Sequence, residues 1–158
     1  MSTQALPRER QLEAWVRFLR AHAALTRELS AELVAEHGLT INDYEVLLHL
    51  QREPEKRLRR VDLAGRVLLT ASGITRLLEG LEDQGLVERA ACETDRRVVY
   101  AKLTDAGEQK LREASGTHLA GIHELFTSRF GEDELAALSS LLGRLPGASA
   151  DGPECAPE

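Results

Sequence analysis

Hydrophobic residues recur at steps of three and four along most of this chain, a spacing typical of amphipathic α-helices. Long patterns of this kind cover residues 8–36 and 104–130, and shorter ones lie around 41–51, 61–68, 71–84 and 135–145. Two short apolar runs, one beginning at Val87 and one at 98–100, flank a charged loop and predict two β-strands. The pattern predicts a mostly α-helical fold with a small β-wing.

The stretch from Arg59 to Leu103 combines two of the short helices with the predicted hairpin. Thr70 can cap the second helix through its hydroxyl, and Gly85 can end it in a left-handed turn. Two helices, a tight turn and a β-hairpin together make a winged helix-turn-helix. The second helix of such a motif can enter a DNA major groove, which is about 12 Å wide. The apolar side chains of each helix are expected to form one inner face. On the first helix they are Val61, Leu63, Ala64, Val67 and Leu68, and on the second helix Ile74, Leu77, Leu78 and Leu81.

The helices at the two ends of the chain carry more apolar surface than the small central core can cover. In the first of them, one stripe runs through Leu12, Trp15, Val16 and Leu19, and a second through Phe18, Leu25, Leu29 and Leu33. Two stripes on one helix indicate two neighbours. A two-fold dimer is the commonest way to bury such faces, although burial within a single subunit gives the same periodicity.

Charge is distributed unevenly along the chain. The formal net charge is −6, yet residues 52–102 hold 11 basic and 9 acidic side chains. The winged region is therefore the electropositive part of an acidic protein. The acidic remainder should repel phosphate, which favours docking on DNA in one orientation. Residues 52–60, REPEKRLRR, are predicted to form a basic loop that either contacts phosphates or stays solvated.

Two segments, DLAGRVLLTASGITRLLEGLEDQGLVER and DRRVVYAKLTDAG, resemble the winged-helix core of the MarR family of bacterial transcription regulators. The resemblance extends from about Leu39 to Leu111. It implies a homodimer in which N- and C-terminal helices interlock and carry two DNA-binding lobes. The expected parts are an N-terminal arm and helix (1–38), a winged helix-turn-helix DNA-binding domain (39–103), C-terminal dimerisation helices (104–145) and a disordered tail (146–158).

The polar face of the second short helix supplies the first candidates for contact with double-stranded DNA. A guanidinium can pair with both acceptors of a guanine, so Arg76 is expected to read a base unless it pairs with Glu79. The hydroxyls of Ser72 and Thr75 suit phosphates or base edges, or are simply capping and solvated. A close approach of the backbone would explain Gly73, and Thr70 would cap the helix while its N-terminus faces a phosphate.

The loop of the predicted wing supplies the remaining candidates. The MarR resemblance implies that Arg97 enters the minor groove and that Asp95 holds it there. Arg96 is expected to contact a phosphate or the groove. The alternative for both arginines is a salt bridge within the turn.

The resemblance also implies a crevice for a small, often phenolic or carboxylate, effector between the dimer helices and the DNA-binding lobe. An arginine and a histidine would suit an aromatic anion, whereas the two aromatic residues also fit simple packing roles. The candidates are Trp15, Arg17 or Arg20, His22, Tyr44 and His49.

The two cysteines, Cys92 and Cys155, have no metal-ligand spacing and are predicted to be unpaired thiols. Cys92 lies in the wing, near Arg96, which leaves a redox-responsive regulator as an alternative. The tail holds Cys155.

No catalytic constellation, metal site, phosphate loop or nucleophile elbow stands out, so we expect neither an enzyme nor a cofactor.

No apolar run reaches the ~18 residues of a membrane span, and the N-terminus lacks a signal-peptide pattern, so a cytoplasmic location is expected. The predicted function is that of a sequence-specific transcription regulator, a repressor that binds a pseudo-palindromic DNA site as a dimer. The remaining alternative is a winged-helix module for protein contacts.

Overall fold

The computed structural model describes residues 9–67 and 69–148. The prediction of a mostly α-helical fold with a small β-sheet is confirmed. Most of the predicted tail (146–158), including Cys155, lies outside the described residues, as do the arm before residue 9 and Leu68. The elements are α1 (Glu9–His37), α2 (Ile41–Arg52), η1 (Pro54–Lys56), β1 (Arg57–Arg59), α3 (Arg60–Arg66), α4 (Ala71–Asp83), β2 (Val87–Ala91), β3 (Val99–Leu103), α5 (Asp105–Leu125), η2 (Thr127–Arg129) and α6 (Glu132–Leu142).

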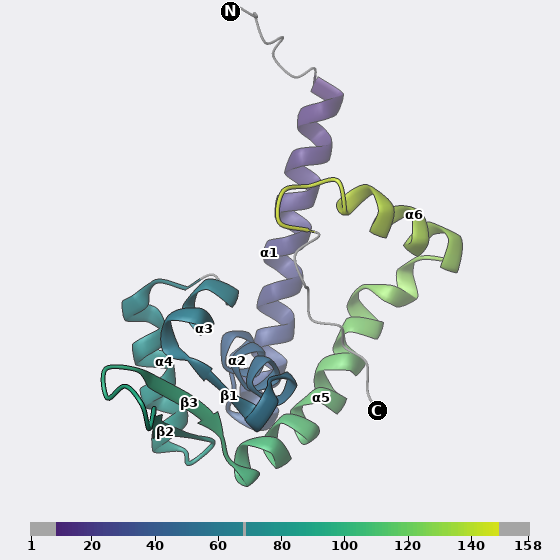
Figure 1. The fold of residues 1–158 in the computed structure, drawn as a ribbon. Helices are drawn as coiled ribbons and strands as arrows, with labels where there is room; N and C mark the ends of the chain where they lie inside the picture. Colours follow the sequence, from purple (N-terminus) through teal and green to yellow (C-terminus); the bar gives the residue numbers. More distant parts are fainter. Residues whose placement is uncertain (1–8, 68, 149–158) are drawn as a thin grey trace, which may run out of the picture.

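The helices and strands form a lobe with two long helices attached to it (Figure 1). The lobe consists of α2, α3, α4 and the sheet, and α5 packs against both α1 and α2. One apolar core joins the lobe to the lower part of α1 and the first half of α5. Its fully buried side chains include Leu33, Leu47, Leu63, Leu78 and Leu81. No helix among the described residues has the length and apolarity needed to cross a membrane.

The sheet has three antiparallel strands in the order β1-β3-β2. The prediction of a loop over residues 52–60 is wrong, because Leu58 pairs with Ala101 of β3 and is buried there. Next to it, the guanidinium of Arg57 lies 4.9 Å from the ring centre of Tyr100. A three-residue strand with one apolar side chain has no periodicity of its own, so only its partner strand reveals it.

The start of α5 is fixed directly to the turn that follows α4. Thr104 caps α5, donates its hydroxyl to the Gly85 carbonyl (2.6 Å) and its backbone N–H to the Leu86 carbonyl (3.2 Å). A Cβ on Gly107 would lie 2.0 Å from that same Leu86 oxygen. Gly85 itself has φ +72°, the left-handed turn predicted for this position. The end of α4 and the beginning of α5 therefore form one rigid junction.

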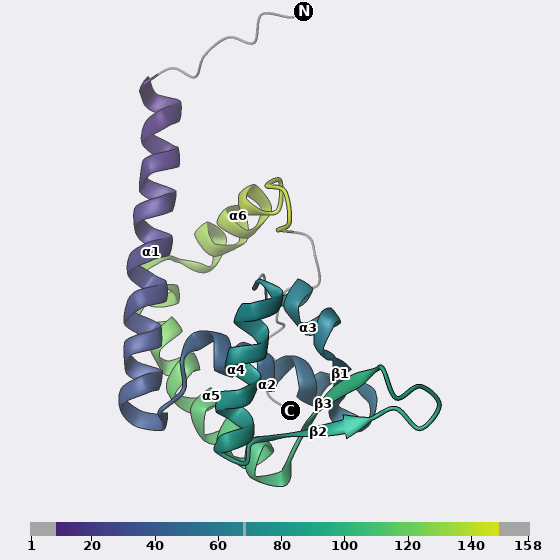
Figure 2. The same cartoon turned by 90° about the vertical axis from the view of Figure 1, so that its left-hand side faces the viewer.

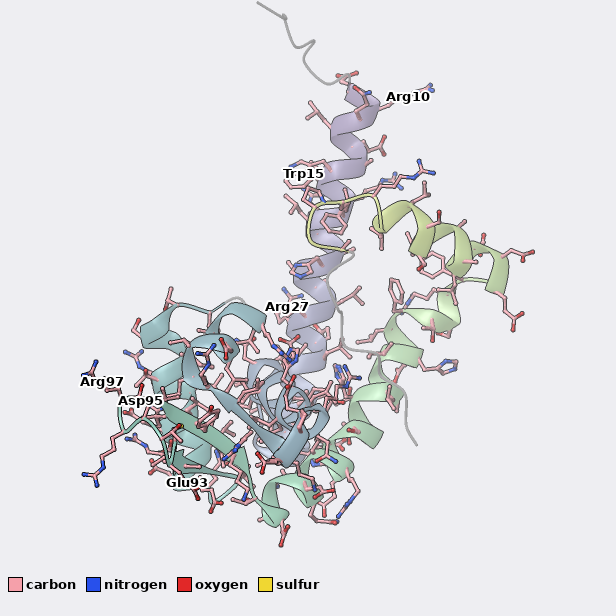
Figure 3. All side chains as sticks on the ribbon, viewed as in Figure 1. Arg10, Trp15, Arg27, Glu93, Asp95 and Arg97 are labelled. Atoms are coloured by element: carbon pink, nitrogen blue, oxygen red, sulfur yellow. The ribbon has the colours of Figure 1, made fainter. Side chains whose placement is uncertain are left out.

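The first half of α1 is not covered by the rest of the chain. Every residue from 9 to 23 is exposed, although the helix contains a run of large apolar side chains there. Trp15 is 56% exposed and Leu19 44%, and Figure 3 places Trp15 far along α1 from the lobe. Exposed apolar faces of this kind mark interaction surfaces. The other large exposed side chains on this segment are Leu12, Val16 and Phe18.

Candidate nucleic-acid interface

Helix α4 has the buried and exposed faces predicted for a recognition helix. Ile74, Leu78 and Leu81 are buried, whereas Ser72 and Arg76 are exposed. The hydroxyl of Thr70 accepts a hydrogen bond from the Gly73 N–H (3.1 Å), so the predicted cap is present. The apolar face fixes the helix to the lobe and presents the polar face to solvent.

The N-terminal turn of α4 is compact around its cap. A Cβ on Gly73 would lie 3.1 Å from the Thr70 hydroxyl oxygen, tighter than an ordinary contact. The Thr70 hydroxyl also lies 3.2 Å from that of Ser72. Thr75 is half-buried. The cap itself does not require a glycine, because Thr40 caps α2 in the same way over Asp43. The close approach of DNA to the backbone at Gly73 stays a prediction.

Arg76 projects from the exposed face without an acidic partner among the described residues. The alternative pairing with Glu79 is absent from the ion pairs of this part of the chain. A guanidinium without an acidic partner keeps its five N–H donors for other acceptors. Arg76 is therefore available to a base edge or a phosphate.

The wing is the hairpin of β2 and β3, which projects from the lobe on the side away from α1 (Figure 2). In its loop, the Asp95 carboxylate accepts a hydrogen bond from the backbone N–H of Arg97 (3.0 Å), and the Asp95 carbonyl accepts one from Val98 (3.1 Å). Asp95 therefore shapes the backbone of the turn. Figure 3 shows Asp95 and Arg97 at the outer end of the hairpin.

Arg96 and Arg97 are exposed, and neither takes part in an ion pair among the described residues. The salt bridge within the turn, the alternative considered for both, does not form in this part of the structure. Positive charge at the tip of a protruding hairpin is the arrangement that a narrow, electronegative minor groove attracts.

The basic segment before α3 directs its charges mostly toward the protein. Lys56 pairs with Glu108 of α5 (2.5 Å), and Arg57 pairs with Glu55 (2.5 Å). Arg59 pairs with Asp62 (2.7 Å) and Arg60 with Glu82 (2.9 Å). These contacts tie β1 and α3 to neighbouring elements, so the segment contributes less free positive charge than its composition suggests.

The comparisons with known proteins agree with this geometry. The profile of the MarR family matches residues 37–98, from the start of the lobe into the wing. The chain is 30% identical in sequence to AbsC, a MarR family transcriptional regulator from Streptomyces coelicolor. The crystal structure of AbsC matches it with a TM-score of 0.80, and the match covers 88% of this chain and 93% of AbsC. The chain belongs to the MarR family.

Two further relatives of this MarR-family chain come from the same comparisons. Sco3205, a MarR family transcriptional regulator from Streptomyces coelicolor solved in complex with DNA, is 25% identical with a TM-score of 0.83, covering 89% of this chain and 88% of that one. The HTH-type transcriptional regulator MhqR of Bacillus subtilis is 28% identical over 137 residues, 87% of this chain and 92% of that protein. These relatives are transcription regulators rather than enzymes.

The other titratable groups of this MarR-family lobe do not form a metal site. Within residues 9–67 and 69–148, no three His, Cys, Asp or Glu side chains gather closely enough to hold an ion.

The sulfur of Cys92, which directly follows β2, lies 3.2 Å from the Thr94 hydroxyl oxygen. Hydrogen bonds from the Thr94 side chain and from the Thr94 and Asp95 backbone stabilise the thiolate and lower the pKa of Cys92.

The candidate effector residues do not come together within one chain. Trp15, Arg20 and His22 lie on the uncovered half of α1. Tyr44 is buried, with its ring 4.6 Å from that of His118 and its hydroxyl 3.2 Å from that of Ser115. His49 is half-buried near the end of α2, where burial and then the charges of Arg66 and Arg52 lower its pKa. The other arginine considered, Arg17, pairs with Glu13 (2.6 Å).

One of these residues, His22, borders an open groove along α1. The groove has a volume of about 650 Å³ and is mainly apolar. It continues the exposed apolar stripe of α1 and reaches Ile41 at the start of α2. Arg27, labelled in Figure 3, and His22 are its basic side chains. The remaining lining comes from Ala23, Thr26, Ser30, Ala31 and Val34.

Proposed function

We propose that this MarR-family regulator is a homodimeric repressor that binds a pseudo-palindromic operator and leaves it when a small aromatic acid binds. In each lobe, α4 enters a major groove and the wing enters the flanking minor groove. The half-sites lie about one helical turn, ~34–36 Å, apart. The observation that carries the proposal is that Arg76 and Arg97 are both exposed and have no acidic partner within residues 9–67 and 69–148, on α4 and on the wing of one lobe.

The DNA contacts are tested by titrating DNA from around the protein's own gene against the wild type and two variants. Arg76→Ala should cost about 1–3 kcal/mol and relax sequence preference. Arg97→Ala should weaken binding through the minor groove. Arg10→Ala, at the exposed start of α1 and far from the wing, is the matched control and should bind like the wild type. Wild-type affinity in both test variants would show that α4 and the wing are not the DNA-binding elements.

The homodimer is supported by the uncovered half of α1, whose apolar face needs a partner. A second copy of the chain brings an identical face, as a two-fold interface requires. Leu19→Glu places a charge on that stripe and should shift the molecular mass in solution from dimer to monomer. Arg20→Glu, on the adjacent exposed position, is the control because it adds an acidic group beside the stripe. A Leu19→Glu protein that remains dimeric would place the interface elsewhere.

The groove along α1 is the proposed effector site. Its apolar wall would hold an aromatic ring, while Arg27 and His22 would attract a carboxylate. An effector that binds one spacing of the two lobes better than the other shifts the dimer away from operator. Trp15 is the only tryptophan of the chain, so its fluorescence can report binding of an aromatic acid on the same helix. Arg27→Gln should weaken that binding and Arg10→Gln should not; equal binding by both would exclude the groove.

A redox-responsive regulator is the second candidate, because the pKa of Cys92 is lowered and the thiol lies in the wing. Oxidation there would alter the hairpin that carries Arg97. Peroxide should then release DNA from the wild type but not from Cys92→Ser. Equal DNA binding by both proteins after peroxide would remove this candidate.

A further inference from the structure

Glu82 is placed where three elements of the DNA-binding lobe meet. It belongs to the last turn of α4. One carboxylate oxygen accepts a hydrogen bond from the Arg60 guanidinium at the start of α3 (2.9 Å), and the other accepts one from the Arg89 guanidinium in β2 (2.8 Å). Among the ion pairs of residues 9–67 and 69–148, it is the one carboxylate that binds arginines from two other elements.

The surroundings of this triad give it more weight than an ordinary surface pair. The side chains of Glu82 and Arg60 are each only 20% exposed, while Arg89 is 54% exposed. The Nε of Arg60 is buried and makes no hydrogen bond in the described structure. Glu82 is therefore the acidic group that satisfies the charge of a largely buried guanidinium. Losing one partner of such a pair leaves the other uncompensated.

The backbone alone gives the wing only a short connection to the recognition helix. A left-handed turn at Gly85 separates the end of α4 from the start of β2. Arg89 lies in the middle of β2, opposite Ala101 of β3. Its contact with Glu82 therefore fixes the direction of the hairpin relative to α4 beyond the turn. The contact with Arg60 fixes α3 in the same way.

We infer that Glu82 is a positioning residue for sequence discrimination, because it holds the recognition helix and the wing in the one relative orientation that places both in their grooves. This inference rests on the proposed DNA-binding function. Glu82 also keeps two guanidiniums engaged within the protein. Removing its charge loosens the orientation and frees Arg60 and Arg89 for phosphates. Discrimination between DNA sequences should then fall while binding to unrelated DNA is maintained or rises.

The test is Glu82→Gln, compared with Asp83→Asn. Asp83 is exposed, adjacent in α4 and outside the ion pairs of the described residues, so its variant makes the same charge change without disturbing the triad. Each protein is titrated with operator and with unrelated DNA over a range of salt. Glu82→Gln should lower the ratio of the two affinities by about tenfold, the size of one lost base contact. Its salt slope on unrelated DNA should steepen by up to ~0.9 for each arginine that reaches a phosphate.

The single variant Arg89→Gln and a double variant separate positioning from direct contact by Arg89. If Arg89 acts through Glu82, the double variant Glu82→Gln, Arg89→Gln should discriminate no worse than Glu82→Gln alone. Additive losses would show that Arg89 reads DNA itself and would overturn its part of the inference. The thermal midpoint is recorded for every protein, since general destabilisation lowers affinity for both DNAs together.

The outcomes for Glu82 and for the proposed function are distinct. A wild-type protein that selects no sequence would overturn the proposed function and, with it, the role of Glu82. A wild type that discriminates alongside a Glu82→Gln variant that discriminates equally well would overturn the role of Glu82 alone. Equal loss of affinity for both DNAs, in step with a lower thermal midpoint, would reduce Glu82 to a stabilising residue.

Discussion

Replacing Gly107 with alanine tests the junction between the end of α4 and the start of α5. The new Cβ would lie 2.0 Å from the Leu86 carbonyl oxygen and 2.7 Å from a methyl carbon of Leu103. The oxygen belongs to the backbone, so it cannot rotate away as a side chain would. To reach an ordinary contact near 3.4 Å, the start of α5 and the turn must separate by about 1.4 Å. That movement also stretches the hydrogen bond from the Thr104 N–H to Leu86.

The cost follows from three contributions. Overpacking of this kind costs about 1–3 kcal/mol or more, and a lost hydrogen bond adds about 1 kcal/mol. The better helix propensity of alanine returns up to about 1 kcal/mol. We therefore expect Gly107→Ala to lower the free energy of unfolding by about 1–4 kcal/mol. A loss of 3 kcal/mol corresponds to a fall in Tm of roughly 6–12 °C for a chain of this length.

The assay is thermal or urea unfolding at one fixed protein concentration, because the stability of the proposed dimer would depend on concentration. Gly116→Ala is the matched control, since Gly116 is exposed in the same helix and a Cβ there meets no atom within 4 Å. The control should be unchanged or slightly more stable. A Gly107→Ala protein as stable as its Gly116→Ala counterpart would refute the close approach of α5 to the turn.

Three further predictions concern other positions. Burial lowers the pKa of His118 below its ordinary 6.5, so the unfolded chain binds more protons than the folded chain as the pH falls below that value. The Tm of the wild type should therefore decrease when the pH is lowered from about 7 to 5, and the Tm of His118→Phe should decrease less. An undiminished fall in the variant would assign the effect to other groups. In a Cys155→Ser background, Thr94→Val should slow iodoacetamide alkylation of Cys92 near neutral pH, because the thiolate loses its main hydrogen bond; an unchanged rate would contradict this. Gly121→Ala should cost only about 0–1 kcal/mol in urea unfolding, since its Cβ meets flexible ends of Glu32 (2.6 Å) and Leu29 (2.9 Å); a cost equal to that of Gly107→Ala would contradict it.

The recognition helix and the wing were predictable because local signals specify them. Thr70 and Gly85 mark the ends of α4, and the spacing of its leucines marks the buried face. The inner face predicted for α3 was wrong in one position: Val61 is 72% exposed. Residues 61 and 63 lie two positions apart, about 200° around a helix, so Val61 and Leu63 cannot share one face.

The contacts between distant residues could not be predicted in this way. Periodicity tells which side of an element is buried, but it does not say what lies opposite. Nothing in the spacing of Arg60, Glu82 and Arg89 indicates that one carboxylate joins all three. For the same reason, Tyr44 has the packing role that was the alternative for it, yet its partner His118 was not foreseen.

The uncovered half of α1 links the order of this helix to the protein concentration if the chain pairs as proposed. An isolated helical segment of about 15 residues is only marginally stable in water. Residues 9–23 are helical only as an extension of the packed second half of α1, because nothing in the described chain covers them. In the proposed homodimer, burial of their apolar stripe would add free energy to the helical form. Order in this segment and assembly of that dimer would then be linked by mass action, so the fraction of chains with a fully ordered α1 would rise with protein concentration.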